Sequence, residues 1–177
     1  MIKEIKLTTV RETGPVGESV QKPETVAALW RESVATAQWY DTEKEAFVVF
    51  LLDRKNRVKS WHMVSVGTID TSLVHAREVF RAACVAAAAS VIVAHQHPSG
   101  DPTPSAEDVK ITKQLVAAGQ VVGIPVLDHV VIGDPAILPP GYVSLRDKGY
   151  LNFTPNTARR ARADRTRAGD PCRAPHP

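Results

Sequence analysis

A short, nearly apolar segment rich in β-branched residues runs directly into two histidines and then into a loop rich in proline and glycine. The segment spans residues 90–94 and reads Ser-Val-Ile-Val-Ala, a composition typical of a strand that is buried on both faces. After the loop, residues 105–118 show the pattern of a helix that ends at Gly119. This strand–loop–helix order predicts a sheet that is covered by helices.

Helical and extended patterns alternate along the rest of the chain. Further helices are expected at residues 23–38 and 73–88, and further strands at residues 47–53, 58–67, 124–132 and 142–145. The first two of these strands are joined by a short polar turn, which predicts an antiparallel hairpin. Because the hairpin is combined with helical connections, we expect a mixed α/β fold with a central mixed β-sheet flanked by helices.

The composition excludes several classes of protein. Apolar residues make up 44% of the chain and charged residues 23%, as in ordinary globular proteins. The longest nearly apolar run, residues 84–94, is far shorter than the roughly 20 residues of a membrane span. Charged residues among the first six positions do not fit a signal peptide. Cys84 and Cys172 cannot form a disulfide framework, so we expect a cytoplasmic protein in which Cys84 is a small buried group.

The net charge of +3 comes from the C-terminal segment. Residues 154–177 contain six arginines and two aspartates, which leaves a net charge of −1 for the remainder of the chain. Because this segment has almost no large apolar side chains, we expect it to be disordered. We therefore expect an N-terminal extension with one helix at residues 1–39, the main folded domain at residues 40–153, and a basic tail that could contact nucleic acid weakly.

The two histidines and the helix that follows predict a metal site. His95 and His97 are two residues apart at the end of a strand, so their imidazoles project to the same side. Asp108 lies in the first turn of the predicted helix, and Ser105 is its predicted N-cap. Two imidazoles and one carboxylate that meet form a zinc site with three protein ligands and one position for water.

The pattern His-x-His, seven residues, Ser-x-x-Asp resembles the signature of the JAMM (MPN-type) metallopeptidase superfamily. The run from His95 to Ser105 is similar to its RadC-like branch, with Gln96 where that branch usually carries asparagine. The similarity also includes Gly67-Thr68, His75-Ala-Arg77-Glu78-Val79 and Leu127-Asp-His129. The resemblance covers residues 40–150. It implies a cytidine-deaminase-like JAMM/MPN fold in a short form without the N-terminal helix-hairpin-helix region.

The resemblance also implies roles for individual residues. His95, His97 and Asp108 match the ligands of Zn²⁺, and Ser105 matches the residue that supports the oxyanion. The superfamily has a glutamate upstream that holds the water and transfers its proton. Glu45 is our candidate for this glutamate and Glu43 is the alternative. His129 is either a group that supports the metal ligands or a structural histidine.

These residues predict a zinc metallopeptidase-type hydrolase that cleaves a peptide or isopeptide bond by metal-activated water. Its substrate would be an unknown protein or peptide. The alternative function is a RadC-type accessory protein associated with DNA repair or nucleic acid, for which the arginine-rich tail is the only support. The sequence lacks the His-Glu-x-x-His motif of helical zinc proteases and the Pro-Cys-x-x-Cys motif of nucleobase deaminases.

Overall fold

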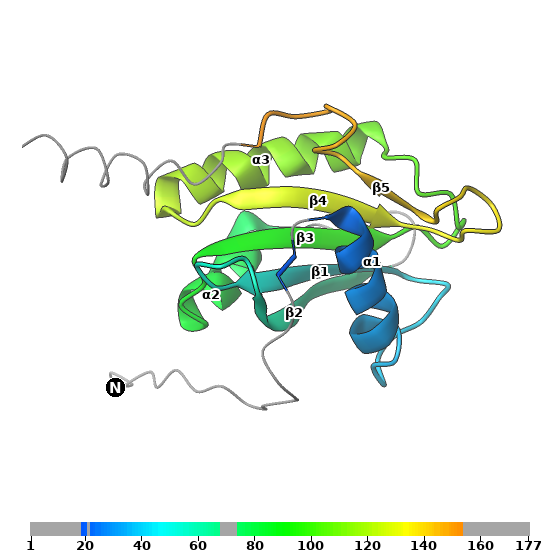
Figure 1. The fold of residues 1–177 in the computed structure, drawn as a ribbon, viewed down its shortest axis with the longest axis horizontal. Helices are drawn as coiled ribbons and strands as arrows, with labels where there is room; N and C mark the ends of the chain where they lie inside the picture. The colour runs from blue at the N-terminus through cyan, green and yellow to red at the C-terminus, as the bar shows by residue number, and fades with distance from the viewer. Residues whose placement is uncertain (1–18, 21, 68–73, 154–177) are drawn as a thin grey trace, which may run out of the picture.

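The computed structural model describes residues 19–20, 22–67 and 74–153 of the chain. A five-stranded sheet forms its centre, with the strand order β2-β1-β3-β4-β5 (Figure 1). The strands are β1 (Glu45–Leu52), β2 (Val58–Gly67), β3 (Ser90–Gln96), β4 (Val126–Ile132) and β5 (Tyr142–Ser144). β3 and β4 are parallel, whereas the other neighbouring pairs are antiparallel. The mixed sheet and the predicted β1–β2 hairpin are therefore confirmed.

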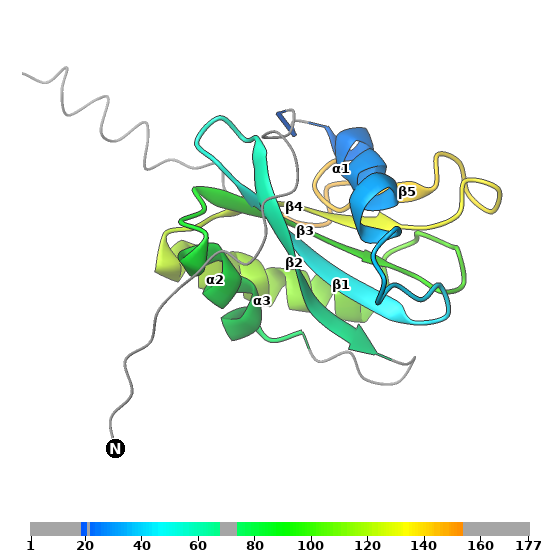
Figure 2. The same cartoon turned by 90° about the horizontal axis from the view of Figure 1, so that it is seen from below.

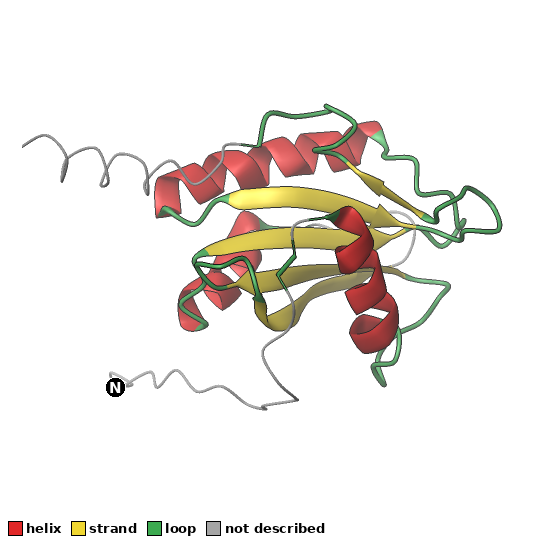
Figure 3. Cartoon of the chain, in the orientation of Figure 1, coloured by secondary structure: helices red, strands yellow, loops and turns green. Residues whose placement is uncertain are grey.

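Helices cover both faces of this sheet (Figures 2 and 3). α2 (Ala76–Val85) and α3 (Ala106–Val122) lie on one face. α1 (Pro23–Leu29) and the π-helical turn η1 (Trp30–Val34) lie on the other. The helix expected in the N-terminal extension thus covers the sheet, and it ends about four residues earlier than its sequence pattern suggested.

The alternation of side chains along the strands divides the core into two layers. In β1, Val48 and Phe50 pack against Trp30 on the α1 face. Their neighbours Phe47 and Val49 pack toward α2 and α3 on the opposite face. All seven residues of β3 are buried, which confirms the two-sided burial that its composition predicts. The C-terminal end of β3 therefore lies in the middle of the sheet, with a helical layer on each side.

The C-terminal end of α3 differs from the expectation. The helix ends at Val122 and is closed by Gly123, whose φ of 73° is left-handed, and not by Gly119. Gly119 is required for a different reason, because a Cβ there would lie 2.6 Å from the carbonyl oxygen of Ile124. The chain leaves α3 by folding back over Gly119, and only a residue without a side chain allows this close approach.

Cys84 is a second correction. It is exposed, because α2 buries the stripe formed by Val79, Phe80 and Ala83. In the described ranges no helix is both long and apolar enough to span a bilayer. The expected tail, residues 154–177, lies outside the described residues.

Candidate metal centre

Three side chains meet where β3 ends and α3 begins. His95 Nε2 lies 3.0 Å from His97 Nε2 and 3.1 Å from Asp108 Oδ1. His97 Nε2 lies 3.3 Å from Asp108 Oδ2. His95 is fully buried and Asp108 is 8% exposed, so the cluster is shielded from bulk water on most sides. The structure therefore brings together the three residues that the sequence predicts as ligands.

A capping box at the start of α3 holds Asp108 in place. Ser105 Oγ accepts a hydrogen bond from Asp108 N at 3.1 Å, and Ser105 N donates to Asp108 Oδ2 at 2.7 Å. Ser105 Oγ also donates to Asp108 Oδ2 at 2.7 Å. Burial alone would raise the pKa of Asp108, but the adjacent imidazoles of His95 and His97, which favour the charged carboxylate when they are protonated, hold this pKa well below its usual range. Asp108 is therefore a carboxylate at neutral pH.

A chain of buried hydrogen bonds determines the tautomer of His95. Thr112 Oγ1 donates to the carbonyl oxygen of Asp108, so its lone pair accepts from His129 Nδ1, 2.6 Å away. Burial lowers the pKa of His129 well below its usual value, so this ring is neutral and its Nε2 is an acceptor. That acceptor lies 2.7 Å from His95 Nδ1. Assigned from this network, His95 carries its hydrogen on Nδ1 and a lone pair on Nε2.

The orientation of His97 leads to the same arrangement. Its Nδ1 lies 2.8 Å from the carbonyl oxygen of Asp101, so Nδ1 donates and Nε2 presents a lone pair. Burial opposes protonation of this imidazole, yet the pKa of His97 is raised, because the protonated ring would donate both to Asp108 and to the Asp101 carbonyl. Two imidazole lone pairs and a carboxylate thus face one point. Such a set of acceptors needs a cation between them, either a proton or a metal ion.

The three side chains lie close enough to share one metal ion. Atoms bound to one zinc at about 2.0–2.1 Å lie about 3.3 Å from each other. His95 Nε2 has similar spacings to His97 Nε2 and to Asp108 Oδ1, 3.0 and 3.1 Å, whereas the 3.3 Å contact of His97 is with the other carboxylate oxygen, Oδ2. With one atom taken from each residue, the three ligand atoms lie within 4.8 Å of one another. Within the described residues, His95, His97 and Asp108 are the one group of three such side chains close enough to share an ion. The donor set of two imidazoles and a carboxylate also suits zinc.

Glu45 is the first residue of β1 and lies beside this cluster. Its Oε1 is 4.0 Å from His95 Nε2, and its side chain is 28% exposed. The sheet register explains the position, because Phe47 pairs with His95 in antiparallel strands, which places Glu45 opposite the residue that follows β3. Glu43 lies in the preceding turn and is exposed, and its backbone N–H donates a hydrogen bond to Asp41 Oδ1. The register favours Glu45 over Glu43 as the carboxylate next to the ligands.

Gln96 lies between the two histidines but points to the opposite face of β3. Its Nε2 donates to the carbonyl oxygens of Asp41, at 3.1 Å, and Lys44, at 2.8 Å. This amide therefore holds the turn that leads into Glu45. The sequence showed Gln96 only as a departure from the usual asparagine and gave no sign of this contact, because the partners are more than fifty residues away.

His129 and Thr112 support the predicted ligands without belonging to that set. His129 had two open interpretations, and its hydrogen bond to His95 assigns it to the supporting network. Thr112 was not recognised from the sequence, although it follows Asp108 by four residues and hence lies on the same face of α3. Asp128 fixes the strand beside them, because its carboxylate accepts from His129 N and Ser144 Oγ, both at 2.7 Å.

Comparison with protein families agrees with this geometry. The family model of the RadC-like JAB domain matches residues 20–150, a wider range than the 40–150 over which the motifs show the resemblance. The additional part contains α1 and η1, which complete the core on one face of the sheet. The chain belongs to the RadC-like JAB domain family, and its mixed sheet with flanking helices is the fold expected for a JAB/MPN domain.

Several relatives carry the name UPF0758 protein. One from Caldanaerobacter subterraneus is 47% identical over 135 residues, which cover 76% of this chain and 54% of the relative. One from Bacillus cereus is 45% identical over 133 residues, covering 75% and 55% of the two chains. A third, from Methanosarcina mazei, is 46% identical over 111 residues, covering 63% and 46%. The chain thus spans about half the length of these relatives.

Proposed function

We propose that this protein is a zinc-dependent hydrolase that cleaves a peptide or isopeptide bond. One observation carries the proposal: two imidazole lone pairs, oriented by hydrogen bonds, and the Asp108 carboxylate lie close enough together to share one ion. Three protein ligands are typical of catalytic zinc sites, in which the fourth position takes water or substrate. Membership of the JAB-domain family supports a hydrolase of this type.

Each remaining residue has a defined task in such a reaction. His95, His97 and Asp108 would hold the ion, which when bound supplies a Lewis acid and lowers the pKa of its water to about 7. Glu45 accepts the proton of the attacking water and returns it to the leaving amine. The Ser105 hydroxyl, whose hydrogen is on Asp108 Oδ2 in this structure, would turn that hydrogen to the negative charge that develops on the substrate carbonyl.

The proposal is tested with Glu45→Gln and the matched control Glu43→Gln. Each variant removes one carboxylate, and the two positions are two residues apart. Of the two glutamates, only Glu45 lies within 4.0 Å of His95 Nε2. We expect Glu45→Gln to retain zinc and to lower kcat by about 10²–10⁴-fold, the usual worth of a general base. We expect Glu43→Gln to behave like the wild type.

The measurement compares zinc content and cleavage products for the three proteins, with a proteome-derived peptide library and isopeptide-linked peptides analysed by mass spectrometry in H₂¹⁸O. Incorporation of ¹⁸O into the new carboxyl group identifies hydrolysis by water. If the zinc-loaded wild type and the zinc-loaded Glu45→Gln variant cleaved at equal rates, Glu45 would not be the general base. Zinc-loaded wild type that leaves every peptide and isopeptide intact would refute the hydrolase.

A further inference from the structure

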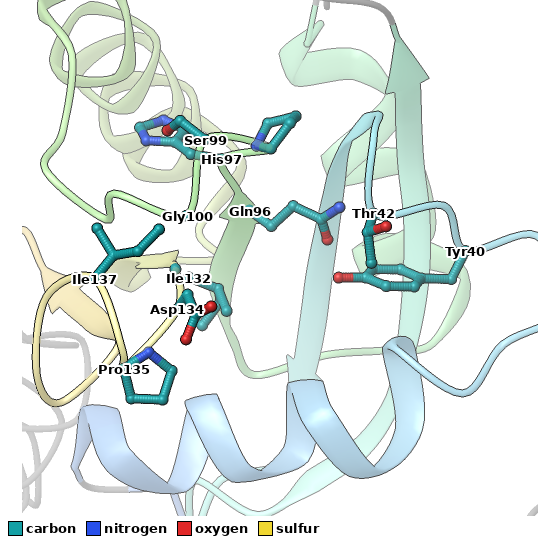
Figure 4. A pocket seen from close by; sticks show the side chains of 12 residues that line it. Tyr40, Thr42, Gln96, His97, Ser99, Gly100, Ile132, Asp134, Pro135 and Ile137 are labelled. Atoms are coloured by element: carbon teal, nitrogen blue, oxygen red, sulfur yellow. The ribbon is translucent and has the colours of Figure 1, made fainter.

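A pocket of about 350 Å³ lies around the end of β3 and adjoins the cluster of His95, His97 and Asp108 (Figure 4). His97 belongs to both, since its ring joins the cluster while the residue also lines the pocket. The other walls come from the turn at residues 40–42 and from the loop between β4 and β5. The volume is at the lower end of the roughly 300–1,000 Å³ that is typical of small-ligand sites, so it suits one side chain.

The Gln96 side chain gives this pocket a defined polarity. Its Nε2 hydrogens are both committed to the carbonyl oxygens of Asp41 and Lys44, so the amide cannot flip. Its Oε1 is therefore fixed as an acceptor, and it is buried without a hydrogen-bond partner among the described residues. Gln96 as a whole is 5% exposed. Figure 4 shows the amide between His97 and Tyr40 at the pocket wall. A buried acceptor without a partner is unfavourable, so a ligand that donates a hydrogen bond there would be favoured.

The rest of the lining restricts the kind of donor. Ile132, Pro135 and Ile137 supply apolar surface, and Asp134 supplies a carboxylate. None of the described residues that line the pocket is a lysine or an arginine. Asp134 Oδ1 accepts from the backbone N–H of Ala136 at 2.8 Å, which holds the side chain in its loop. Apolar walls with acceptors at the end match a side chain that has an apolar stem and a cationic donor at its tip.

We propose that this pocket is a substrate subsite for an arginine or lysine side chain next to the scissile bond. The methylene stem packs on Ile132 and Ile137, and the cationic end donates to Gln96 Oε1 and to the Asp134 carboxylate. This inference rests on the proposed function, because only a hydrolase has a scissile bond. The pocket lies beside the cluster of His95, His97 and Asp108, since His97 belongs to both. The binding of the side chain itself requires no turnover.

Nuclear magnetic resonance titration of the zinc-supplemented full chain tests the subsite. The probes are the N-acetyl methylamides of arginine, lysine, glutamine and norleucine, and the reporter is the side-chain NH₂ signal of Gln96. Norleucine has the apolar stem of lysine without the ammonium group. We expect the arginine and lysine probes to shift the Gln96 signal and the norleucine probe to bind at least about tenfold more weakly, because it cannot donate.

Asp134→Asn and Glu32→Gln separate the local charge from the net charge. Both remove one exposed carboxylate, but Glu32 does not line the pocket. The amide oxygen introduced by Asp134→Asn can still accept from the backbone N–H of Ala136, so the loop keeps its hydrogen bond. We expect Asp134→Asn to weaken the arginine probe about three- to fivefold, as befits an exposed ion pair, and Glu32→Gln to leave it unchanged.

Three results would overturn the subsite: no shift of the Gln96 signal with any probe, equal binding of the norleucine or glutamine probe, or an equal effect of the two variants. Failure of the hydrolase is a separate outcome. A protein that binds the basic probes through Gln96 and Asp134 but cleaves no peptide would retain the subsite and lose the proposed reaction.

Discussion

At the scale of single residues, Thr112 orients His95, a proposed metal ligand that it does not touch. Its hydroxyl donates to the Asp108 carbonyl and accepts from His129, and this direction leaves His95 Nε2 with a lone pair. A valine at this position would have the same shape and no hydroxyl. His129 would then lose the acceptor that fixes its own tautomer, and the direction of the chain would no longer be determined.

We therefore predict that Thr112→Val lowers the affinity for zinc by about 10–100-fold, the usual effect of removing a group that orients a metal ligand. Thr112→Ser restores the hydroxyl and is expected to bind zinc nearly as well as the wild type. Competition with a chromophoric chelator of known affinity measures both. Equal affinity for the valine variant and the wild type would show that the hydrogen-bond chain does not orient His95.

The residues at the centre differ in how far they follow from the sequence. His95 and His97 follow from strand alternation, and Asp108 follows from its place in the first turn of a capped helix. The assignment of Glu45 required the resemblance, and the β1–β3 register adds that this residue lies beside the cluster. Gln96 could not be found from the sequence, because its partners lie in a distant turn. Thr112 shares a face of α3 with Asp108, but its role depends on His129, which comes from another element.

At the scale of elements, α3 depends on two glycines four residues apart. A helical pattern predicts that a glycine ends the helix, but it does not distinguish Gly119 from Gly123. The difference is tertiary, since Gly119 packs against the Ile124 carbonyl whereas Gly123 adopts a left-handed φ with no described atom within 4 Å of its Cβ position. Neither the close contact nor the backbone angle is visible in the sequence.

We predict that both Gly119→Ala and Gly123→Ala destabilise the protein, for different reasons. At Gly119 the new methyl group meets a backbone oxygen, and such overpacking costs about 1–3 kcal/mol of unfolding free energy. At Gly123 a residue with a side chain must adopt a left-handed φ, which costs about 1–2 kcal/mol. Urea unfolding followed by circular dichroism measures both values.

Gly119→Asn and Gly123→Asn tell the two mechanisms apart. Asparagine tolerates left-handed backbone angles, so we expect it to recover part of the lost stability at position 123. At position 119 it should be at least as harmful as alanine. Equal responses of the two positions to alanine and asparagine would contradict the structural distinction between them.

At the scale of the whole molecule, the body and the C-terminal segment have different charges. Residues 154–177 have a net charge of +4, while the remainder has a net charge of −1. We propose that any contact with nucleic acid is made by these arginines and that the metal centre does not depend on them. The family match, residues 20–150, ends before this segment.

Deletion of residues 154–177 is predicted to leave zinc content and thermal stability unchanged. Binding of duplex DNA, measured by fluorescence anisotropy at several salt concentrations, is predicted to fall to background. The undeleted chain, if it uses all six arginines, would show a slope of log K against log salt concentration of about −5. DNA affinity that survives the deletion would place the binding surface on the folded body instead.

The sequence predicts the overall architecture better than it predicts the order of the strands and the placement of the helices. The alternation of helices and strands, with one hairpin, was sufficient to predict a mixed sheet flanked by helices. The sequence did not indicate which face α1 covers or that β3 lies between β1 and β4, because such long-range pairing depends on the fold of the complete chain.

The central claim is that His95, His97 and Asp108 hold one metal ion. Inductively coupled plasma mass spectrometry of the purified wild type, the three single alanine variants and the triple alanine variant tests it directly, with circular dichroism to verify that each variant is folded. We predict about one zinc ion per wild-type chain, a large loss in each single variant and none in the folded triple variant. Wild type that contains no more zinc than the triple variant would contradict the account.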